Sequence, residues 1–307
     1  MIGLRDIPAI TIYSTSDTST AAISSPPYCL MQSSTGDIWV GAKPGGICRL
    51  GHEPFCDDAV YDIAEDSFGR LWVATFGNGV KCIPDPSTPT PALSASSGGR
   101  KVRKLLIADS LLIAATTDGL LTGLIDCTSD TLHDTRIYRR DGAIASSLSS
   151  NALMSVAKDS RGNIYICTES SGCDMTDVAS LLAGTPTFTH FNTATSSLSS
   201  DICRAMTMAS DSTLIIVGND NVMLFNPHTD VCINYNSHFW GDSCRFTEAT
   251  PLQLTDGSWI FGTEQGAVVA SEHNLLSRGY VPALVFVSCS VNGHPGRFAP
   301  TVSPCIK

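Results

Sequence analysis

The stretch EDSFGRLWVATFGNGV, residues 65–80, combines an acidic turn, a tryptophan between aliphatic residues and a second turn with two glycines. Asp66 can cap a tight turn with its own side chain, and Gly69 can take the positive φ that closes it. Residues 71–74 are apolar at every position, which is typical of a strand covered on both faces. Residues 75–79 then reverse the chain into a third strand. The stretch therefore predicts a β-hairpin buried between neighbouring sheets.

The same arrangement recurs along the chain. Clear copies are STGDIWVGAKPGGICRL (34–50), DSRGNIYICTESSG (159–172) and TDGSWIFGTEQGAVV (255–269); weaker copies are ADSLLIAATTDGLL (108–121) and SDSTLIIVGNDNVMLF (210–225). The residues at the turn-glycine position are Gly36, Gly69, Ser110, Gly162, Thr213 and Gly257, at spacings of 33 to 52 residues. Such spacing is typical of propeller blades of four strands, which need neighbours to bury their faces.

A second repeat runs in step with the first. RIYRRDGAIASSLSSNALMSVAKD (136–159) and THFNTATSSLSSDICRAMTMAS (189–210) share an aromatic-ended strand followed by an SSLSS connection, and residues 10–36 form a degenerate third copy. The aromatic-ended segment supplies the fourth strand of each unit, and TDVASLLAG (176–184) is at best one inserted short helix. We therefore predict an all-β fold, a β-propeller of four-stranded blades with six recognisable repeats and six to seven blades.

Composition narrows the class of partner. The formal net charge is −10, only 16% of residues are charged, and no long run of Lys and Arg occurs, so the footprint of a nucleic-acid-binding protein is missing. No stretch approaches 18 consecutive apolar residues, which predicts no membrane contact by this chain. The beginning, MIGLRDIPAITIYS, shows no signal-peptide pattern.

Twelve cysteines are present without a CxxC pair. Several lie in apolar runs, so three alternatives stay open: free core thiols, one or two disulfides, or a metal site. The best zinc combination would be His228, Cys232, His238 and Cys244. Their spacings match no closed zinc motif, and we predict no metal and no cofactor.

Acidic clusters and catalytic motifs give no stronger signal. Asp57, Asp58 and Asp220 lack the ligand count of a calcium loop, and turn capping explains them better. The chain has no G-x-S-x-G elbow, no Walker loop and no dinucleotide fingerprint. We therefore predict no catalytic residue.

Up-and-down strands place alternate connections on the same rim. The D-x-x-G turns share one rim, and the T-x-x-G loops share the other with the SSLSS connections between blades. The second rim is longer and more varied, and we take it as the candidate working face. Its candidate ligand-binding residues are Phe76, Asn78, His238, Trp240 and Arg245.

The chemistry of these side chains suits a sugar. Tryptophan faces stack on sugar rings, and arginine binds carboxylates or sulfates in a bidentate manner. For Trp240 the competing interpretation is a side chain that plugs the edge of the last blade. Tyr138, Arg139 and Arg140 form the one basic and aromatic cluster, which a solvated strand end explains better than a ligand site.

The units resemble the two-component-regulator propeller repeat. This repeat occurs in the periplasmic sensor region of hybrid two-component systems that control polysaccharide use in Bacteroidetes. The residues that match its pattern, D-x-x-G-x-[I/L]-W-[I/V]-G-T-x-x-G-G, are Asp66, Gly69, Trp72, Thr75 and Gly79, and in the first copy Gly36, Trp39, Gly41 and Gly46. The resemblance implies that Gly36, Trp39, Asp66, Gly69, Trp72, Gly162 and Gly257 are structural.

The C-terminal end resembles that family's last blade running into an immunoglobulin-like sandwich. The residues that fit its P-x-L-V-F-x-x-x-x-V-N-G pattern are Pro282, Leu284, Val285, Phe286, Val291, Asn292 and Gly293. We expect a propeller over residues 1–277, partial or complete, and a linker with the first strand of a truncated sandwich over 278–307. The resemblance covers essentially the whole chain and implies a fragment or truncated relative of a longer sensor.

The resemblance implies a non-catalytic extracytoplasmic sensor that binds an oligosaccharide, takes part in signal transduction and belongs to a periplasmic region held at the inner membrane. The histidine kinase of such a sensor is absent from this chain, and a homodimer is left open. Two other classes stay open: a propeller-scaffold enzyme resembling the streptogramin lyases, and a protein-interaction propeller. The lyases need a histidine near the axis, and the seven histidines here do not repeat at the inner strand position.

Overall fold

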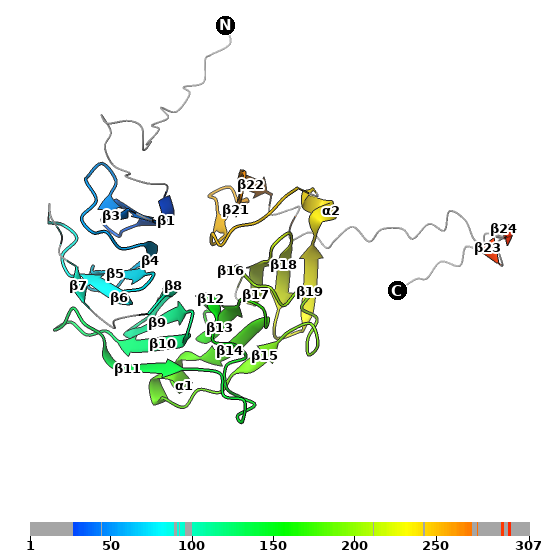
Figure 1. Ribbon diagram of the computed structural model, residues 1–307, viewed down its shortest axis with the longest axis horizontal. Helices are drawn as coiled ribbons and strands as arrows, with labels where there is room; N and C mark the ends of the chain where they lie inside the picture. Colours follow the sequence, from blue (N-terminus) through cyan, green and yellow to red (C-terminus); the bar gives the residue numbers. More distant parts are fainter. Residues whose placement is uncertain are drawn as a thin grey trace, which may run out of the picture.

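The computed structural model describes residues 27–43, 45–88, 91, 93–95, 100–210, 212–241, 243–271, 275, 290–291 and 294–295. Six antiparallel sheets stand around a central axis, and each is made of strands that follow one another in the chain (Figure 1). Four sheets have four strands, whereas the first and the last have three within the described residues. The predicted all-β propeller is confirmed, and the two weak repeats also form complete blades.

The blades are numbered in chain order. Blade 1 holds β1 (Pro27–Gln32), β2 (Ile38–Ala42) and β3 (Gly46–Arg49), and blade 2 holds β4 (Val60–Glu65), β5 (Leu71–Thr75), β6 (Val80–Ile83) and β7 (Ser94–Ala95). Blade 3 holds β8 (Val102–Ala108), β9 (Leu111–Thr116), β10 (Gly119–Leu124) and β11 (His133–Tyr138), and blade 4 holds β12 (Leu153–Lys158), β13 (Asn163–Thr168), β14 (Cys173–Asp177) and β15 (Thr189–Phe191). Blade 5 holds β16 (Ala205–Ser210), β17 (Thr213–Val217), β18 (Val222–Asn226) and β19 (Val231–Tyr235), and blade 6 holds β20 (Leu252–Gln253), β21 (Trp259–Thr263) and β22 (Gly266–Ala270).

The C-terminal region is described only in part. β23 (Ser290–Val291) pairs with β24 (His294–Pro295) as a separate two-stranded hairpin. The other residues that carry the predicted immunoglobulin-like strand, and the predicted boundary at 277, lie outside the described residues. Among the helices that the structure describes, none is long and apolar enough to cross a membrane.

The core lies between neighbouring blades. Every residue of β5 and of β9 is buried, as the continuous apolar pattern predicts for strands covered on both faces. Trp72 and Ala74 of blade 2 pack in one cluster with Leu112 and Ala114 of blade 3. Consecutive blades from blade 1 to blade 6 thus bury their facing sides against each other, whereas β1 of blade 1 and β22 of blade 6 keep exposed residues.

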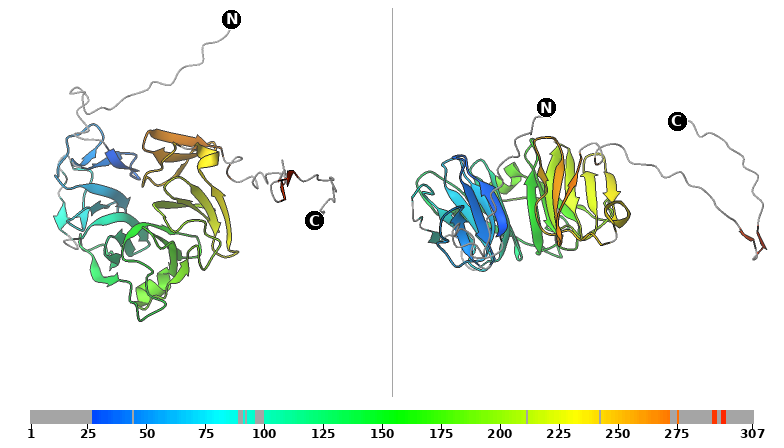
Figure 2. Two further views of the ribbon diagram at one scale, coloured as in Figure 1. Left: turned by 45° about the vertical axis from the view of Figure 1, so that its right-hand side comes forward. Right: turned by 90° about the horizontal axis from the view of Figure 1, so that it is seen from above.

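The strands run between two opposite rims of the propeller, which the right-hand view of Figure 2 shows from the side. The D-x-x-G turns lie on one rim; the T-x-x-G loops and the connections between blades lie on the other. In the T-x-x-G loops of blades 2, 3 and 4 the buried threonine hydroxyl donates to a carbonyl oxygen: Thr75 to Gly79 at 2.8 Å, Thr116 to Gly119 at 2.7 Å and Thr168 to Gly172 at 2.9 Å. The amide of that glycine donates to the following connection, at Arg100, Asn151 and Asp201 respectively. The loops and the connections are therefore fastened together.

The outer parts of the blades also follow the sequence pattern. The outermost strands β11, β15 and β19 end at Tyr138, Phe191 and Tyr235. The predicted short helix is α1 (Val178–Ala183), which Asp177 caps at its N-terminus and which ends at Gly184 with φ of 78°. The leucines of both SSLSS connections, Leu148 and Leu198, are buried.

The D-x-x-G turn of blade 2 is organised by one carboxylate. Asp66 Oδ1 accepts the backbone N–H groups of Phe68 at 2.9 Å and Arg70 at 3.0 Å, which fixes the turn. Asp66 Oδ2 accepts Arg70 Nε and Trp72 Nε1, both at 2.8 Å. Arg70 then donates to the carbonyl oxygens of Asp126 and Ser129 in blade 3. The carboxylate thus connects the turn, the core tryptophan and the next blade.

The same carboxylate arrangement recurs in blade 4. Asp159 accepts the amides of Arg161 and Asn163, the side chain of Asn163 and the hydroxyl of Tyr165, which lies six residues further on, as Trp72 does from Asp66. In blade 1 the corresponding residue is Ser33. There the Trp39 Nε1 is buried without a hydrogen-bond partner among the described residues.

We predict that Asp66→Ala lowers the free energy of unfolding by about 3 kcal/mol or more, because it leaves a buried indole N–H and the buried Nε of Arg70 without an acceptor and removes the counter-charge of the guanidinium. Asp256→Ala is the matched control, since its side chain is exposed in the corresponding turn of blade 6 and caps only Ser258. Urea denaturation of both variants measures the difference. Equal stability of the two variants would contradict the role assigned to Asp66.

A buried acid and a histidine fasten the connection between blades 3 and 4. His190 Nδ1 lies 2.7 Å from Asp174 Oδ1, and its Nε2 lies 3.0 Å from the carbonyl oxygen of Ala145. Burial lowers the pKa of His190, but these two acceptors outweigh it and hold the pKa above the ordinary value of 6.5. Burial raises the pKa of Asp174. Both ring nitrogens face acceptors, so the geometry favours the doubly protonated imidazolium.

We predict a pH-dependent contribution to stability from His190. Because its folded pKa is raised, the stabilisation is complete below pH 6.5 and is lost as the pH rises through the folded pKa. Thermal melts of wild type and His190→Gln between pH 5.5 and 9 give the contribution by difference. The difference should be largest at the acidic end and shrink above pH 6.5. A difference that grows with pH would contradict the assignment.

Candidate functional site

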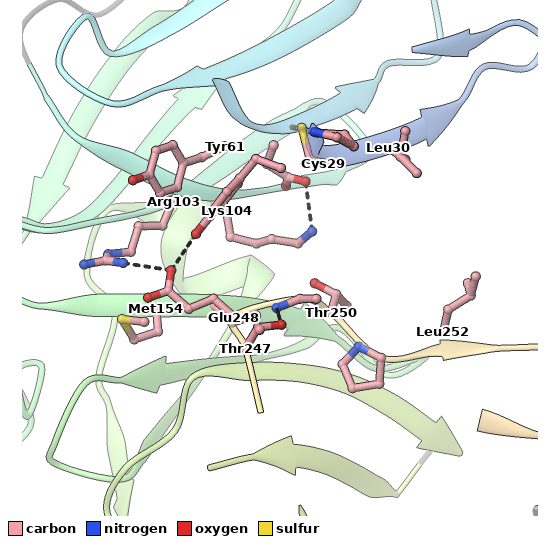
Figure 3. A pocket seen from close by; sticks show the side chains of 16 residues that line it. Cys29, Leu30, Tyr61, Arg103, Lys104, Met154, Thr247, Glu248, Thr250 and Leu252 are labelled. Atoms are coloured by element: carbon pink, nitrogen blue, oxygen red, sulfur yellow. Dashed lines mark hydrogen bonds and ion pairs between the residues drawn. The ribbon is translucent and has the colours of Figure 1, made fainter. Parts of the chain in front are cut away.

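A cavity of about 600 Å³ lies at the axis of the ring. Its walls come from the innermost strands β1, β4, β8 and β12 and from residues 247–252, which lead into β20 of the last blade (Figure 3). The cavity is therefore built from five of the six blades. Such axial positions bring together residues that are far apart in the sequence.

Four β-bulges shape the wall. The register of the innermost strand shifts at Tyr28 in β1, Tyr61 in β4, Arg103 in β8 and Met154 in β12. A bulge inserts one unpaired residue and locally breaks the alternation of side chains between the two faces. Two consecutive residues of each strand therefore line the cavity, for example Tyr61 with Asp62 in β4. The bulges aim one additional side chain from each blade at the axis.

Three aromatic rings form a row at the end of the cavity that faces the T-x-x-G loops. The centroids of the Tyr28 and Tyr61 rings are 4.4 Å apart, and Tyr61 stacks on Phe76 at 4.5 Å with an interplanar angle of 15°. Lys43 donates to the Tyr61 hydroxyl, and its Nζ lies 5.1 Å from the centroid of Phe76. Lys101 Nζ lies 4.9 Å from the same centroid. We call these residues, together with Arg103, the axial mouth.

A carboxylate links the last-blade segment to blades 1 and 3 near the axis. Glu248 Oε2 accepts the Tyr28 hydroxyl at 2.7 Å and Arg103 Nη1 at 3.1 Å, which joins the last-blade segment to blades 1 and 3 (Figure 3). Burial first, and then the hydrogen bond to Glu248, raises the pKa of Tyr28, so this tyrosine remains a neutral donor. Asp62 makes a parallel link by accepting Lys104 Nζ at 2.9 Å and the amide of Leu105 at 2.8 Å. The cavity wall is thus held by charge-assisted bonds between blades.

The structure separates the sequence-predicted site residues. Phe76 lies in the axial mouth. Asn78 is exposed at the tip of the same loop, where its side chain donates to Asp58, which also pairs with Lys81. Phe76 and Asn78 therefore share a loop and a rim, but only Phe76 reaches the cavity residues.

Trp240 belongs to the packing of the last blade. It ends the short helix α2 (Ser237–Trp240), and its Nε1 donates to the Tyr235 carbonyl oxygen at 2.7 Å. Its ring contacts Phe246 and Phe261 at centroid distances of 5.4 and 5.6 Å. His238 on the same helix is exposed. These contacts match the blade-edge plug; ligand contact by Trp240 and His238 stays a prediction.

Arg245 lines a second cavity of about 380 Å³ between blades 5 and 6, with Arg204, Asn219, Asp220 and Glu264. Trp240 is not part of that wall. In the basic and aromatic cluster of Tyr138, Arg139 and Arg140, Arg139 forms two hydrogen bonds with Asp118, at 3.0 and 2.6 Å. The predicted candidates on this rim therefore lie at several places and not in one site.

The ten cysteines in the described part of the chain are free thiols. Cys289 and Cys305 lie outside it. In the same part of the chain no group of three or more His, Cys, Asp or Glu is arranged to hold a metal ion, so the set of His228, Cys232, His238 and Cys244 is not assembled. Of the three cysteine alternatives, the described residues show the first.

Sequence reasoning missed most of the axial mouth. Tyr28, Tyr61 and Arg103 lie outside the repeat motif itself, and so does Glu248 beside them. Lys43 lies inside the first motif copy, at the position that Phe76 takes in blade 2, but it was not singled out. A signal was present: Tyr28, Tyr61 and Met154 each lie five residues before the first residue of the next turn, at Ser33, Asp66 and Asp159. The side chain at this repeat position is tyrosine in blades 1 and 2 and methionine in blade 4.

Comparisons with known proteins agree with the repeat. Residues 54–77 match the model of the Two component regulator propeller family. This match contains the Asp66–Gly69 turn and the Trp72 strand, which carried the resemblance in the sequence, and the resemblance is confirmed. A comparison with curated proteins gives no match.

Solved structures with the same fold come from different functional classes. The extracellular domain of BT4673 from B. thetaiotaomicron, described as a one component system, matches with a TM-score of 0.61 and 16% identity over 82% of this chain. The alignment spans 32% of that domain. The Cps50 (Swd1) propeller of Myceliophteria thermophila matches with a TM-score of 0.58 and 10% identity, over 80% of this chain and 83% of that one. PorZ of Porphyromonas gingivalis matches with a TM-score of 0.56 and 13% identity, over 78% of this chain and 38% of that one.

At these identities the structural likeness shows the fold alone, because one propeller scaffold carries many functions. The match to BT4673 also covers about a third of that domain, so what the larger protein does applies to this chain only as a proposal. The site itself must therefore supply the argument for function.

We predict that Trp240→Ala lowers the free energy of unfolding by about 2–3 kcal/mol, because it leaves a void against Phe246 and Phe261. Phe239→Ala, which removes the neighbouring aromatic ring with 48% of its surface exposed, should cost less than about 1 kcal/mol. Chemical denaturation of the two variants tests this. An unchanged stability of Trp240→Ala would favour a surface role for this tryptophan.

Proposed function

We propose that the chain is a non-catalytic, extracytoplasmic ligand-binding propeller of a two-component sensor, and that its ligand is an oligosaccharide. The observation that carries the proposal is the axial mouth: a row of three aromatic rings at the end of a cavity of about 600 Å³. Aromatic faces and edges with nearby polar groups are the surfaces on which sugar rings stack. The family match at residues 54–77 supports the sensor class.

The position of the mouth suits a sensor. A ligand in the axial cavity contacts residues from five blades at once. It also lies beside Glu248, which joins the last-blade segment to blades 1 and 3. A ligand shifts a conformational equilibrium only through its differential affinity for the two states. Binding here can therefore alter how firmly the first and last blades are held together at the axis.

We predict that Phe76→Ala weakens oligosaccharide binding at least tenfold, which corresponds to about 1.4 kcal/mol. The reason is the loss of one ring from the stacked row. Isothermal titration calorimetry of the chain against a panel of plant and host glycans first identifies the bound member. The variant is then titrated with that glycan after a thermal melt has shown that it is folded.

Phe68→Ala is the matched control, because Phe68 is an aromatic with 53% of its surface exposed in the D-x-x-G turn on the opposite rim. Its affinity should equal that of wild type. A broad panel without a single bound glycan would overturn the proposal. If Phe76→Ala and Phe68→Ala lose the same amount of glycan affinity, the binding site does not lie at the axial mouth.

A further inference from the structure

Four cationic side chains gather around the axial cavity of a chain whose formal net charge is −10. Lys43, Lys101 and Arg103 approach the face of Phe76, with charge centres 5.1, 4.9 and 5.9 Å from its centroid. Lys104 lines the cavity beside Arg103. The backbone bridge between Phe76 and Lys101 holds the loop of blade 2 against the connection to blade 3 at this point.

These cations are held in two different ways. Arg103 and Lys104 are paired with carboxylates, at 3.1 Å from Glu248 and 2.9 Å from Asp62. Lys43 and Lys101 form no ion pair with any carboxylate that the structure describes. Aromatic rings hold them instead, and a ring quadrupole attracts a cation without cancelling its charge. The mouth therefore keeps an excess of positive charge.

The cavity also contains unsatisfied polar groups. Ser155 Oγ and Arg103 Nε are buried and have no hydrogen-bond partner among the described residues, and Ser155 is only 2% exposed. Both residues line the cavity. A buried donor without an acceptor costs about 1–3 kcal/mol. Oxygen atoms of a ligand would supply the acceptors.

We propose that the axial mouth recognises an anionic group, a carboxylate or a sulfate, carried on a sugar chain. The ligand of the sensor is then an acidic oligosaccharide. Its anionic group lies between Lys43 and Lys101, a sugar ring lies against Tyr28 and Tyr61, and ring hydroxyls reach Ser155. Glu248 does not oppose this arrangement, because its charge is already taken up by Arg103 and Tyr28. This proposal rests on the proposed function and adds the chemical class of the ligand.

The test compares ligands that differ only in charge. Oligogalacturonides and their methyl esters form one pair, and sulfated oligosaccharides with their desulfated, carboxyl-reduced derivatives form the other. Each is titrated calorimetrically into the wild-type chain, and sodium sulfate alone is a further arm. We expect an acidic member to bind at least tenfold more tightly than its neutral derivative. Its affinity should also fall between 50 and 200 mM salt, because exposed charges are screened.

Variants assign the effect to the mouth. The double variant Lys43→Gln, Lys101→Gln removes the two ring-held charges and keeps the aromatic row, so it should lose at least tenfold in affinity for the acidic ligand and keep its melting temperature. Arg161→Gln removes one exposed charge from the opposite rim and should leave the affinity unchanged.

The outcomes separate this inference from the proposed function. Equal binding of acidic and neutral members would overturn the inference and leave the oligosaccharide sensor in place. Binding of sulfate as tight as that of any saccharide would keep the anion site and overturn the sugar ligand. If an acidic ligand binds the double variant as tightly as wild type, the anion site does not lie at Lys43 and Lys101. Absence of binding by every probe would overturn the inference, and the broad glycan panel then decides the proposed function.

Discussion

The carboxylate of the D-x-x-G turn is the interaction on which the organisation of blades 2 and 4 depends. In blade 2, Asp66 accepts two backbone N–H groups, a guanidinium and an indole N–H, and so fixes the turn, the core aromatic and a contact to blade 3 together. Asp159 repeats the arrangement in blade 4 with asparagine and tyrosine. A buried carboxylate is tolerated only when its acceptor capacity is used, and here each oxygen has two donors.

The shape of the axial cavity follows from the repeated scaffold and from the β-bulge in the innermost strand of four blades. The D-x-x-G turn fixes the pairing register at one end of the two innermost strands of a blade. The bulge shifts that register at the other end, next to the first residue of the innermost strand and close to the T-x-x-G rim. A bulge re-aims a side chain at a defined place without disturbing the core. Because the scaffold repeats, four blades present their bulge residues, Tyr28, Tyr61, Arg103 and Met154, to the same axis.

Much of the fold could be predicted from the sequence because each residue type of the repeat has a distinct physical role. Gly69 marks a turn that needs positive φ, Trp72 marks a strand with two buried faces, and Thr75 caps the next loop. The site could be predicted only in part. Phe76 could be named as a candidate because it lies in a motif loop. Trp240 attracted attention by its residue type, but its contacts are those of blade packing.

The residues that sequence reasoning missed share one property: their position matters more than their type. Lys43 lies in the blade 1 loop that corresponds to the Phe76 loop, and Lys101 lies in the basic stretch RKVRK (100–104). Nothing in either stretch shows that both cations approach Phe76. Glu248 becomes informative only when the ring brings blade 6 back to blade 1. Such convergence depends on the curvature of the whole ring, which periodicity alone does not specify.

Hydrogen exchange with and without the bound oligosaccharide tests the location of the site most directly. Binding at the axial mouth predicts slowed exchange in β1, β4 and β8, in the Phe76 loop and around Glu248, with the D-x-x-G turns unchanged. Slowed exchange confined to α2 and the outer strands, with the innermost strands unaffected, would contradict it.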